Sequence, residues 1–83
     1  MYQLKLTGRA KKEFKNIKKI YEVAINSALQ DIKEDPFIGK ALTRELTGKF
    51  SLKIGVYRII YKVNRKDKIV NILSAGHRAT VYA

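Results

Sequence analysis

The fold is decided by the segment FSLKIGVYRIIYKV, residues 50–63, in which polar and apolar side chains alternate on both sides of Gly55-Val56. A period of two is typical of strands with one buried face. Glycine at the first central position is what a two-residue type II′ hairpin turn requires. The register of this hairpin collects six apolar side chains on one face: Phe50, Leu52, Ile54, Tyr57, Ile59 and Tyr61.

The same register places two cations opposite each other on the other face of the hairpin. Lys53 faces Arg58, and like charges directly opposite on a sheet are destabilising. A shared anion such as a phosphate would reverse the sign of that interaction. The alternative is that both side chains extend into solvent and repel each other weakly.

The segments around this hairpin predict two helices and two more strands. Residues 2–6 alternate as a first strand, and residues 69–75 form the third strand of an antiparallel meander. Thr7 is the expected N-cap of a first helix with an apolar stripe of Ala10, Phe14 and Ile17. A second helical pattern runs over residues 21–35 and ends where Pro36 disfavours continuation. Residues 37–49 read as a loop with one turn around residues 42–46.

The expected architecture is therefore a single α+β domain covering residues 1–83. It consists of an N-terminal strand, a helical hairpin and a three-stranded antiparallel meander, with the helices packed on one face of the sheet. A chain of 83 residues builds one hydrophobic core and leaves no room for a second domain. The apolar fraction of 46% is high enough to support folding.

The composition points to an anionic partner. Eighteen Lys and Arg residues against seven Asp and Glu residues give a net charge of +11, which favours binding to a polyanion. Zero cysteines and one histidine argue against a zinc or thiolate site, so we expect no metal and no cofactor. The absence of cysteine agrees with a cytoplasmic location. No apolar run is long enough to cross a membrane, and residues 1–6 do not look like a signal peptide.

Residues 74–83, SAGHRATVYA, carry further candidate functional side chains beyond the last expected strand. A strand beside residues 56–63 would end near Arg58, which brings His77 and Arg78 toward the Lys53/Arg58 pair. Because neighbours alternate on an extended backbone, at most one of these two side chains faces the pair, and we favour Arg78. The alternative is structural: His77 caps a strand and Tyr82 packs its ring on the sheet.

Taken together, these segments resemble a known family of toxins. The hairpin of residues 50–63, followed by Gly76-His77-Arg78 and Val81-Tyr82, is similar to the RelE branch of the RelE/ParE toxins of bacterial and archaeal toxin–antitoxin pairs. The resemblance extends over nearly the whole chain. It departs from the family in having Lys53 where many relatives have arginine, and Ser51 where the prototype has a second lysine.

The resemblance implies a ribosome-dependent endoribonuclease that enters the A site, cuts translated messenger RNA and is held inactive in a hetero-oligomer with a cognate acidic antitoxin. By position it assigns the catalytic roles to Lys53, Arg58, Arg78 and Tyr82. Cleavage of RNA through its own 2′-hydroxyl needs a base, cations for the developing charge and an acid, but no metal. The arginines suit the phosphate. Lys53, crowded by cations, or Tyr82 is a conceivable base, and Tyr82 is also able to stack on a nucleobase.

The first helix is expected to carry a second basic segment of six cations, with Glu13 as the only opposing acid. We expect it to contact ribosomal RNA or an acidic antitoxin segment, together with His77. The alternative is an ordinary solvated face, although Lys11/Lys15 and Lys15/Lys19 would be unfavourable like-charge pairs on a helix. The cations of this segment are Arg9, Lys11, Lys12, Lys15, Lys18 and Lys19.

Two other functions are compatible with the same sequence. ParE-type inhibitors of DNA gyrase share the fold and act without catalysis, so the fold alone does not decide between them. A small basic RNA-binding module with no activity of its own is the third possibility. The nuclease is expected to cleave translated messages. The gyrase inhibitor is expected to cause DNA damage and leave messages intact. The RNA-binding module is expected to do neither.

Overall fold

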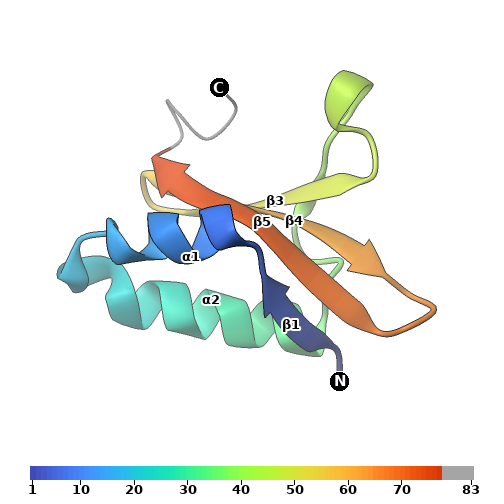
Figure 1. Cartoon of the computed structure of the whole chain (residues 1–83), viewed down its shortest axis with the longest axis horizontal. Coiled ribbons are helices and arrows are strands. Elements are labelled where there is room, and N and C mark those ends of the chain that lie inside the picture. The colour runs from blue at the N-terminus through green and yellow to red at the C-terminus, as the bar shows by residue number, and fades with distance from the viewer. Residues whose placement is uncertain (78–83) are drawn as a thin grey trace.

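The computed structural model describes residues 1–77 and shows an α+β domain (Figure 1). Five strands form one sheet in the order β1-β5-β4-β3-β2. In Figure 1 the two α-helices lie together below this sheet. The α+β prediction, with both helices on one face, is confirmed. The strands are β1 (Gln3–Leu6), β2 (Lys40–Ala41), β3 (Lys49–Ile54), β4 (Tyr57–Asn64) and β5 (Ile69–His77).

The first helix, α1 (Gly8–Lys15), begins where Thr7 was expected to cap it. The Thr7 hydroxyl accepts a hydrogen bond from Ala10 N at 3.1 Å and donates one to Leu73 O at 2.9 Å. One side chain therefore caps the helix and ties it to β5. The expectation that Lys18 and Lys19 lie on this helix was wrong, because α1 ends at Lys15 with Asn16 as its C-cap, and Lys18 has a non-helical backbone with ψ 138°.

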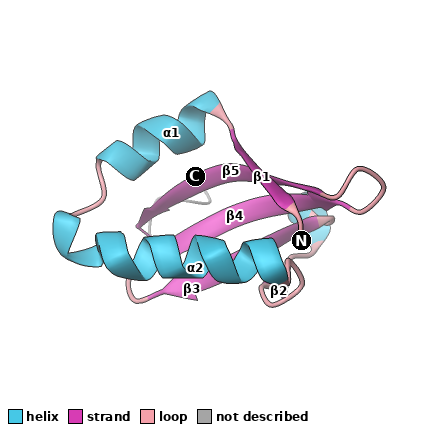
Figure 2. Ribbon diagram, turned by 90° about the horizontal axis from the view of Figure 1, so that it is seen from below, coloured by secondary structure: helices cyan, strands magenta, loops and turns pink. Residues whose placement is uncertain are grey.

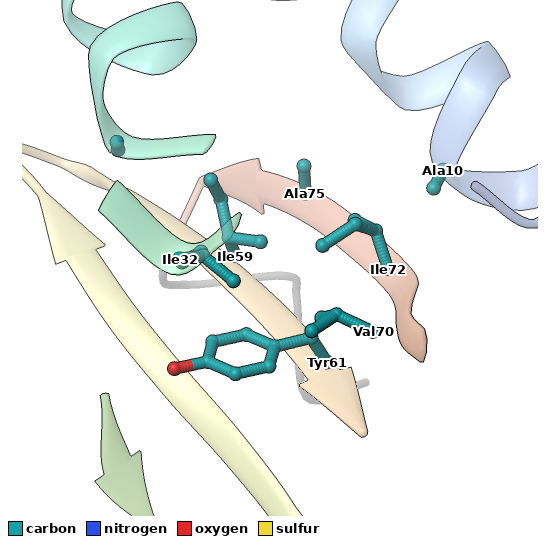
Figure 3. Close-up of a cluster of buried hydrophobic side chains, with 8 residues drawn as sticks. Ala10, Ile32, Ile59, Tyr61, Val70, Ile72 and Ala75 are labelled. Carbon is teal, nitrogen blue, oxygen red and sulfur yellow. The ribbon is translucent and has the colours of Figure 1, made fainter. Parts of the chain in front are cut away.

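The second helix, α2 (Glu22–Glu34), follows a short 3₁₀ turn, η1 (Lys19–Tyr21). Its buried side chains are Ile25, Ala28 and Ile32, which recur at spacings of three and four and therefore share one face. Figure 2 shows α2 running across β3 and β4 on the side that α1 also occupies. The core lies between this helical layer and the sheet (Figure 3), and its fully buried sheet residues are Ile59, Tyr61, Val70, Ile72 and Ala75.

The β3–β4 hairpin has the register expected from the sequence. Ile54 pairs with Tyr57 across the Gly55-Val56 turn, and Phe50 pairs with Tyr61. Gly55 has a φ of +59°, a conformation that glycine adopts without strain. β4 and β5 continue the antiparallel meander, with a register shift between Ile60 and Tyr61.

Two strands at the edges complete the sheet beyond the meander. β1 pairs parallel with β5, with Lys5 opposite Asn71. β2 pairs with β3 inside the segment expected to be a loop, so the loop prediction was wrong at Lys40 and Ala41, and also at Lys49, where β3 begins. A two-residue strand carries too short a pattern to be recognised from alternation. The turn expected around residues 42–46 is confirmed as a 3₁₀ turn, η2 (Arg44–Leu46).

Tyr61 fixes the connection between α2 and β2. Its buried hydroxyl donates to Pro36 O at 2.8 Å and accepts from Gly39 N at 3.1 Å. Burial raises the pKa of Tyr61, the hydrogen bond from Gly39 opposes that shift, and the charge of Asp35 adds to it. The side chain is a structural anchor that stays neutral at physiological pH. In residues 1–77 no helix has the length and apolar character needed to cross a membrane.

Candidate nucleic-acid interface

The face of the sheet that points away from the helices carries the predicted cation pair. β3 and β4 place Lys53 directly opposite Arg58. Their neighbours Leu52, Ile54 and Ile59 belong to the core on the other face. Lys53 is exposed and Arg58 is partly buried. We call this surface the open face, and the Lys53–Arg58 pair the first rung.

The turn geometry brings the two side chains of the first rung close together. In a hairpin closed by a two-residue turn, the flanking residues form a hydrogen-bonded pair and the next pair is non-hydrogen-bonded. Ile54 and Tyr57 are the flanking residues, so Lys53 and Arg58 form a non-hydrogen-bonded pair. Cα atoms of such a pair are about 4.5 Å apart, closer than in the alternate pair. The hairpin therefore concentrates two positive charges at one place.

The open face has a buried floor beside the first rung. Ser51 pairs with Ile60, and Ile60 pairs with Ser74 on β5. These side chains are only 3%, 5% and 4% exposed, respectively. Sequence reasoning missed the two serines, because a small polar residue in an alternating strand normally indicates the solvent side.

The end of β5 lies next to the first rung, as expected. Gly76 pairs with Arg58, and His77 pairs with Tyr57. Tyr57 lies on the helix side of the sheet, where its ring meets that of His77 edge to face with centroids 6.4 Å apart. His77 is therefore on the opposite face from Lys53 and Arg58. Arg78 and Tyr82 lie outside the described residues.

The chemistry of the open face is that of an anion site. Within residues 1–77 no group of three or more His, Asp or Glu side chains is placed to hold a metal ion. The first rung offers an ammonium and a guanidinium, both hydrogen-bond donors without acceptor capacity. Arg58 is suited to bidentate contact with a phosphate, and Lys53 supplies a point charge.

Comparison with known proteins places this arrangement in a family. The model described as the ParE toxin of the type II toxin–antitoxin system parDE matches residues 4–82. The chain belongs to this family. Toxin RelG of Mycobacterium tuberculosis is 32% identical to it over 83 residues, covering 98% of this chain and 95% of RelG.

Solved structures support the same assignment. The toxin is similar to a chain of the RelBE2 toxin–antitoxin complex of M. tuberculosis, with a TM-score of 0.82, 32% identity and coverage of 93% and 98% of the two chains. It is also similar to the isolated E. coli RelE toxin, with a TM-score of 0.81, 26% identity and coverage of 99% and 92%. It is a RelE-type toxin of the RelE/ParE superfamily.

The other basic segment of the toxin is on the opposite side of the sheet from the first rung. α1 packs on the helix face of the sheet, against β5 and β1. Arg9 Nε contacts Glu13 Oε1 at 3.3 Å. The remaining cations of this segment are all exposed: Lys11, Lys12, Lys15, Lys18 and Lys19.

Glu13 has a role in the toxin that its sequence position did not indicate. Its Oε1 atom accepts a hydrogen bond from Ala75 N at 3.3 Å, across 62 residues of sequence. β1 pairs with β5 only up to Ile72, so this carboxylate satisfies a backbone group further along the same strand. Glu13 thereby helps to hold the end of β5, which borders the first rung through Gly76.

Proposed function

We propose that the toxin is an mRNA interferase, a ribosome-dependent endoribonuclease that inhibits translation without a metal ion. The observation that carries the proposal is the first rung. Two cations face each other at the close pair of a hairpin, and like charges directly opposite on a sheet repel each other. A phosphodiester bound between them would convert this repulsion into attraction. The resemblance to RelE toxins, which implies an endonuclease of messenger RNA, makes an RNA phosphodiester the ligand that we favour.

The proposed reaction uses the RNA 2′-hydroxyl as the nucleophile. A base removes its proton, the O2′–P bond forms and the P–O5′ bond breaks, leaving a 2′,3′-cyclic phosphate and a 5′-hydroxyl that has received a proton. Arg58 stabilises the charge that develops on the phosphoryl oxygens. Arg78 is proposed from the sequence for the same role, and Lys53 or Tyr82 for the base, with Tyr82 also able to stack on a nucleobase.

The proposed partners are messenger RNA, the ribosome and an acidic antitoxin. Related chains are known from complexes described as RelBE toxin–antitoxin assemblies. A chain of net charge +11 favours an acidic partner, and binding on the open face would block access of RNA to the first rung. The basic side chains around α1, together with His77, are proposed contacts to ribosomal RNA or to the antitoxin. These partners imply a cytoplasmic location.

The proposal is tested by expressing the toxin in a translating extract and mapping the ends of the message. Cleavage within translated codons, absent for the same message when translation is blocked, is expected. DNA damage with intact messages would instead indicate inhibition of gyrase, which the family relationship to ParE keeps as the alternative. If neither message cleavage nor DNA damage is observed, the remaining candidate is a basic RNA-binding module without activity of its own.

A further inference from the structure

The open face contains a second pair of opposed cations that the catalytic site does not use. Lys49 on β3 pairs directly with Lys62 on β4. Both residues alternate with the core residues Phe50 and Tyr61, so they lie on the same face as Lys53 and Arg58. We call the Lys49–Lys62 pair the second rung.

The second rung repeats the geometry of the first. Each lysine is four residues from its counterpart in the first rung, so this pair is also non-hydrogen-bonded and its side chains are close. In residues 1–77 no carboxylate lies within ion-pair distance of Lys49 or Lys62. Two like-charge pairs on a single hairpin are unfavourable for folding, and both become favourable when anions bind there.

The register continues the second rung across the sheet. Lys62 pairs with Asn71 on β5, and Asn71 pairs with Lys5 on β1. Leu4 and Leu6 pack against the core, so the exposed Lys5 lies on the open face. Lys40 pairs with Ser51 between the two rungs at the β2 edge. The cations thus extend from the first rung toward the other end of the sheet.

The spacing of the rungs fits a single extended strand of nucleic acid. Four residues of a β-strand span roughly 13 Å, which is longer than one sugar-phosphate repeat. One phosphate therefore cannot contact both rungs. A strand whose phosphates recur at regular intervals satisfies both, whereas a single small anion satisfies only one.

We propose that the second rung, with Lys5 in line, binds a further backbone phosphate of the same single-stranded RNA that is held at the first rung. This inference rests on the proposed function for the identity of the ligand. The contact is independent of base sequence and fixes the position of the strand on the sheet. Its contribution to RNA binding is electrostatic and falls as salt rises.

The test is the salt dependence of binding to a 2′-O-methyl oligouridylate, an RNA analogue that cannot be cleaved through its 2′ position. For single strands, log K falls with log salt with a slope of about −0.7 for each phosphate neutralised. We expect K49Q/K62Q to make the slope shallower by about 0.7 and to weaken binding at low salt by roughly tenfold. The matched control K33Q/K66Q removes the same charge from α2 and from the β4–β5 turn and should change the slope far less.

Four results would overturn the inference. A slope unchanged in K49Q/K62Q, or changed equally in the control, would mean that these lysines form an ordinary solvated surface. Binding to polyglutamate is measured as well. If K49Q/K62Q loses binding to polyglutamate but keeps its binding to the oligonucleotide, the second rung would be assigned to an acidic protein partner. Absence of binding between the unmodified toxin and the oligonucleotide would also reject the inference. The assay needs no ribosome, so a toxin that binds through both rungs but cuts no message would refute the nuclease alone.

Discussion

Replacing Lys53 with glutamine separates the contribution of the first rung to stability from its contribution to function. Lys53 is exposed and lies opposite Arg58 at a close, non-hydrogen-bonded position. The change removes one of two like charges and keeps a side chain of similar length. We therefore expect K53Q to stabilise the free toxin and to impair RNA cleavage.

The size of the stabilisation follows from Coulomb's law. Two unit charges at the ends of neighbouring flexible side chains, roughly 8 Å apart in water, repel by about 0.5 kcal/mol. This value lies within the range measured for cross-strand pairs, about 0.2–1 kcal/mol. For a domain of this size it corresponds to an increase in Tm of about 2–4 °C. Salt screens the repulsion, so the increase should nearly disappear in molar salt.

The assay is thermal unfolding of the free toxin in phosphate-free buffer at low and molar salt, combined with message cleavage in a translating extract. Lys66→Gln in the exposed β4–β5 turn is the matched control for net charge. We expect K53Q to lose cleavage by at least roughly 100-fold, the lower end of the loss typical of a general base. A lower Tm for K53Q, an increase that persists in molar salt, or full cleavage activity would refute the reasoning.

Three further changes probe the site and its support. Arg58→Lys keeps the charge but loses the planar guanidinium, so message cleavage should fall at least about tenfold while circular dichroism shows a folded protein; unchanged cleavage would exclude bidentate contact. Tyr61→Phe should lower the free energy of unfolding by about 1–3 kcal/mol in urea titrations, because Pro36 O and Gly39 N lose their partner. The folded-state pKa of Tyr61 is raised above its usual 10.0. The stabilising contribution of its hydroxyl is therefore present below pH 10 and is lost as pH rises through the folded-state pKa. An equally large loss of stability at alkaline pH in Y61F would contradict this. Thr7→Ala should cost about 1–2 kcal/mol in the same titrations, and no loss would mean that the cap and the bond to Leu73 are dispensable.

The hairpin was predictable because its sequence constrains it twice. Gly55 marks the turn, and the alternation from Phe50 to Tyr61 independently sets the register, so both indicate that Lys53 opposes Arg58. The same register extended by one pair also places Lys49 opposite Lys62. The strand predicted from the sequence began at Phe50, one residue after Lys49, and therefore did not include the second rung.

Other features depend on tertiary contacts that leave no local pattern. The carboxylate of Glu13 on α1 accepts a hydrogen bond from Ala75 N on β5, and the Tyr61 hydroxyl organises residues 36–39. The buried Ser51 was indistinguishable from a solvent-facing serine. The helix boundary at Asn16 was missed because Ile17 continues the apolar spacing of the helix and packs against the core from outside it.

The most direct test of the central claim uses a message with a single 2′-deoxy nucleotide at a mapped cleavage position. Cleavage by the proposed mechanism needs that hydroxyl as the nucleophile. We predict that the unmodified message is cut during translation to give a 2′,3′-cyclic phosphate, and that the 2′-deoxy message remains intact at that position. Equal cleavage of both messages would contradict the account, because the bond would then be broken without the RNA hydroxyl.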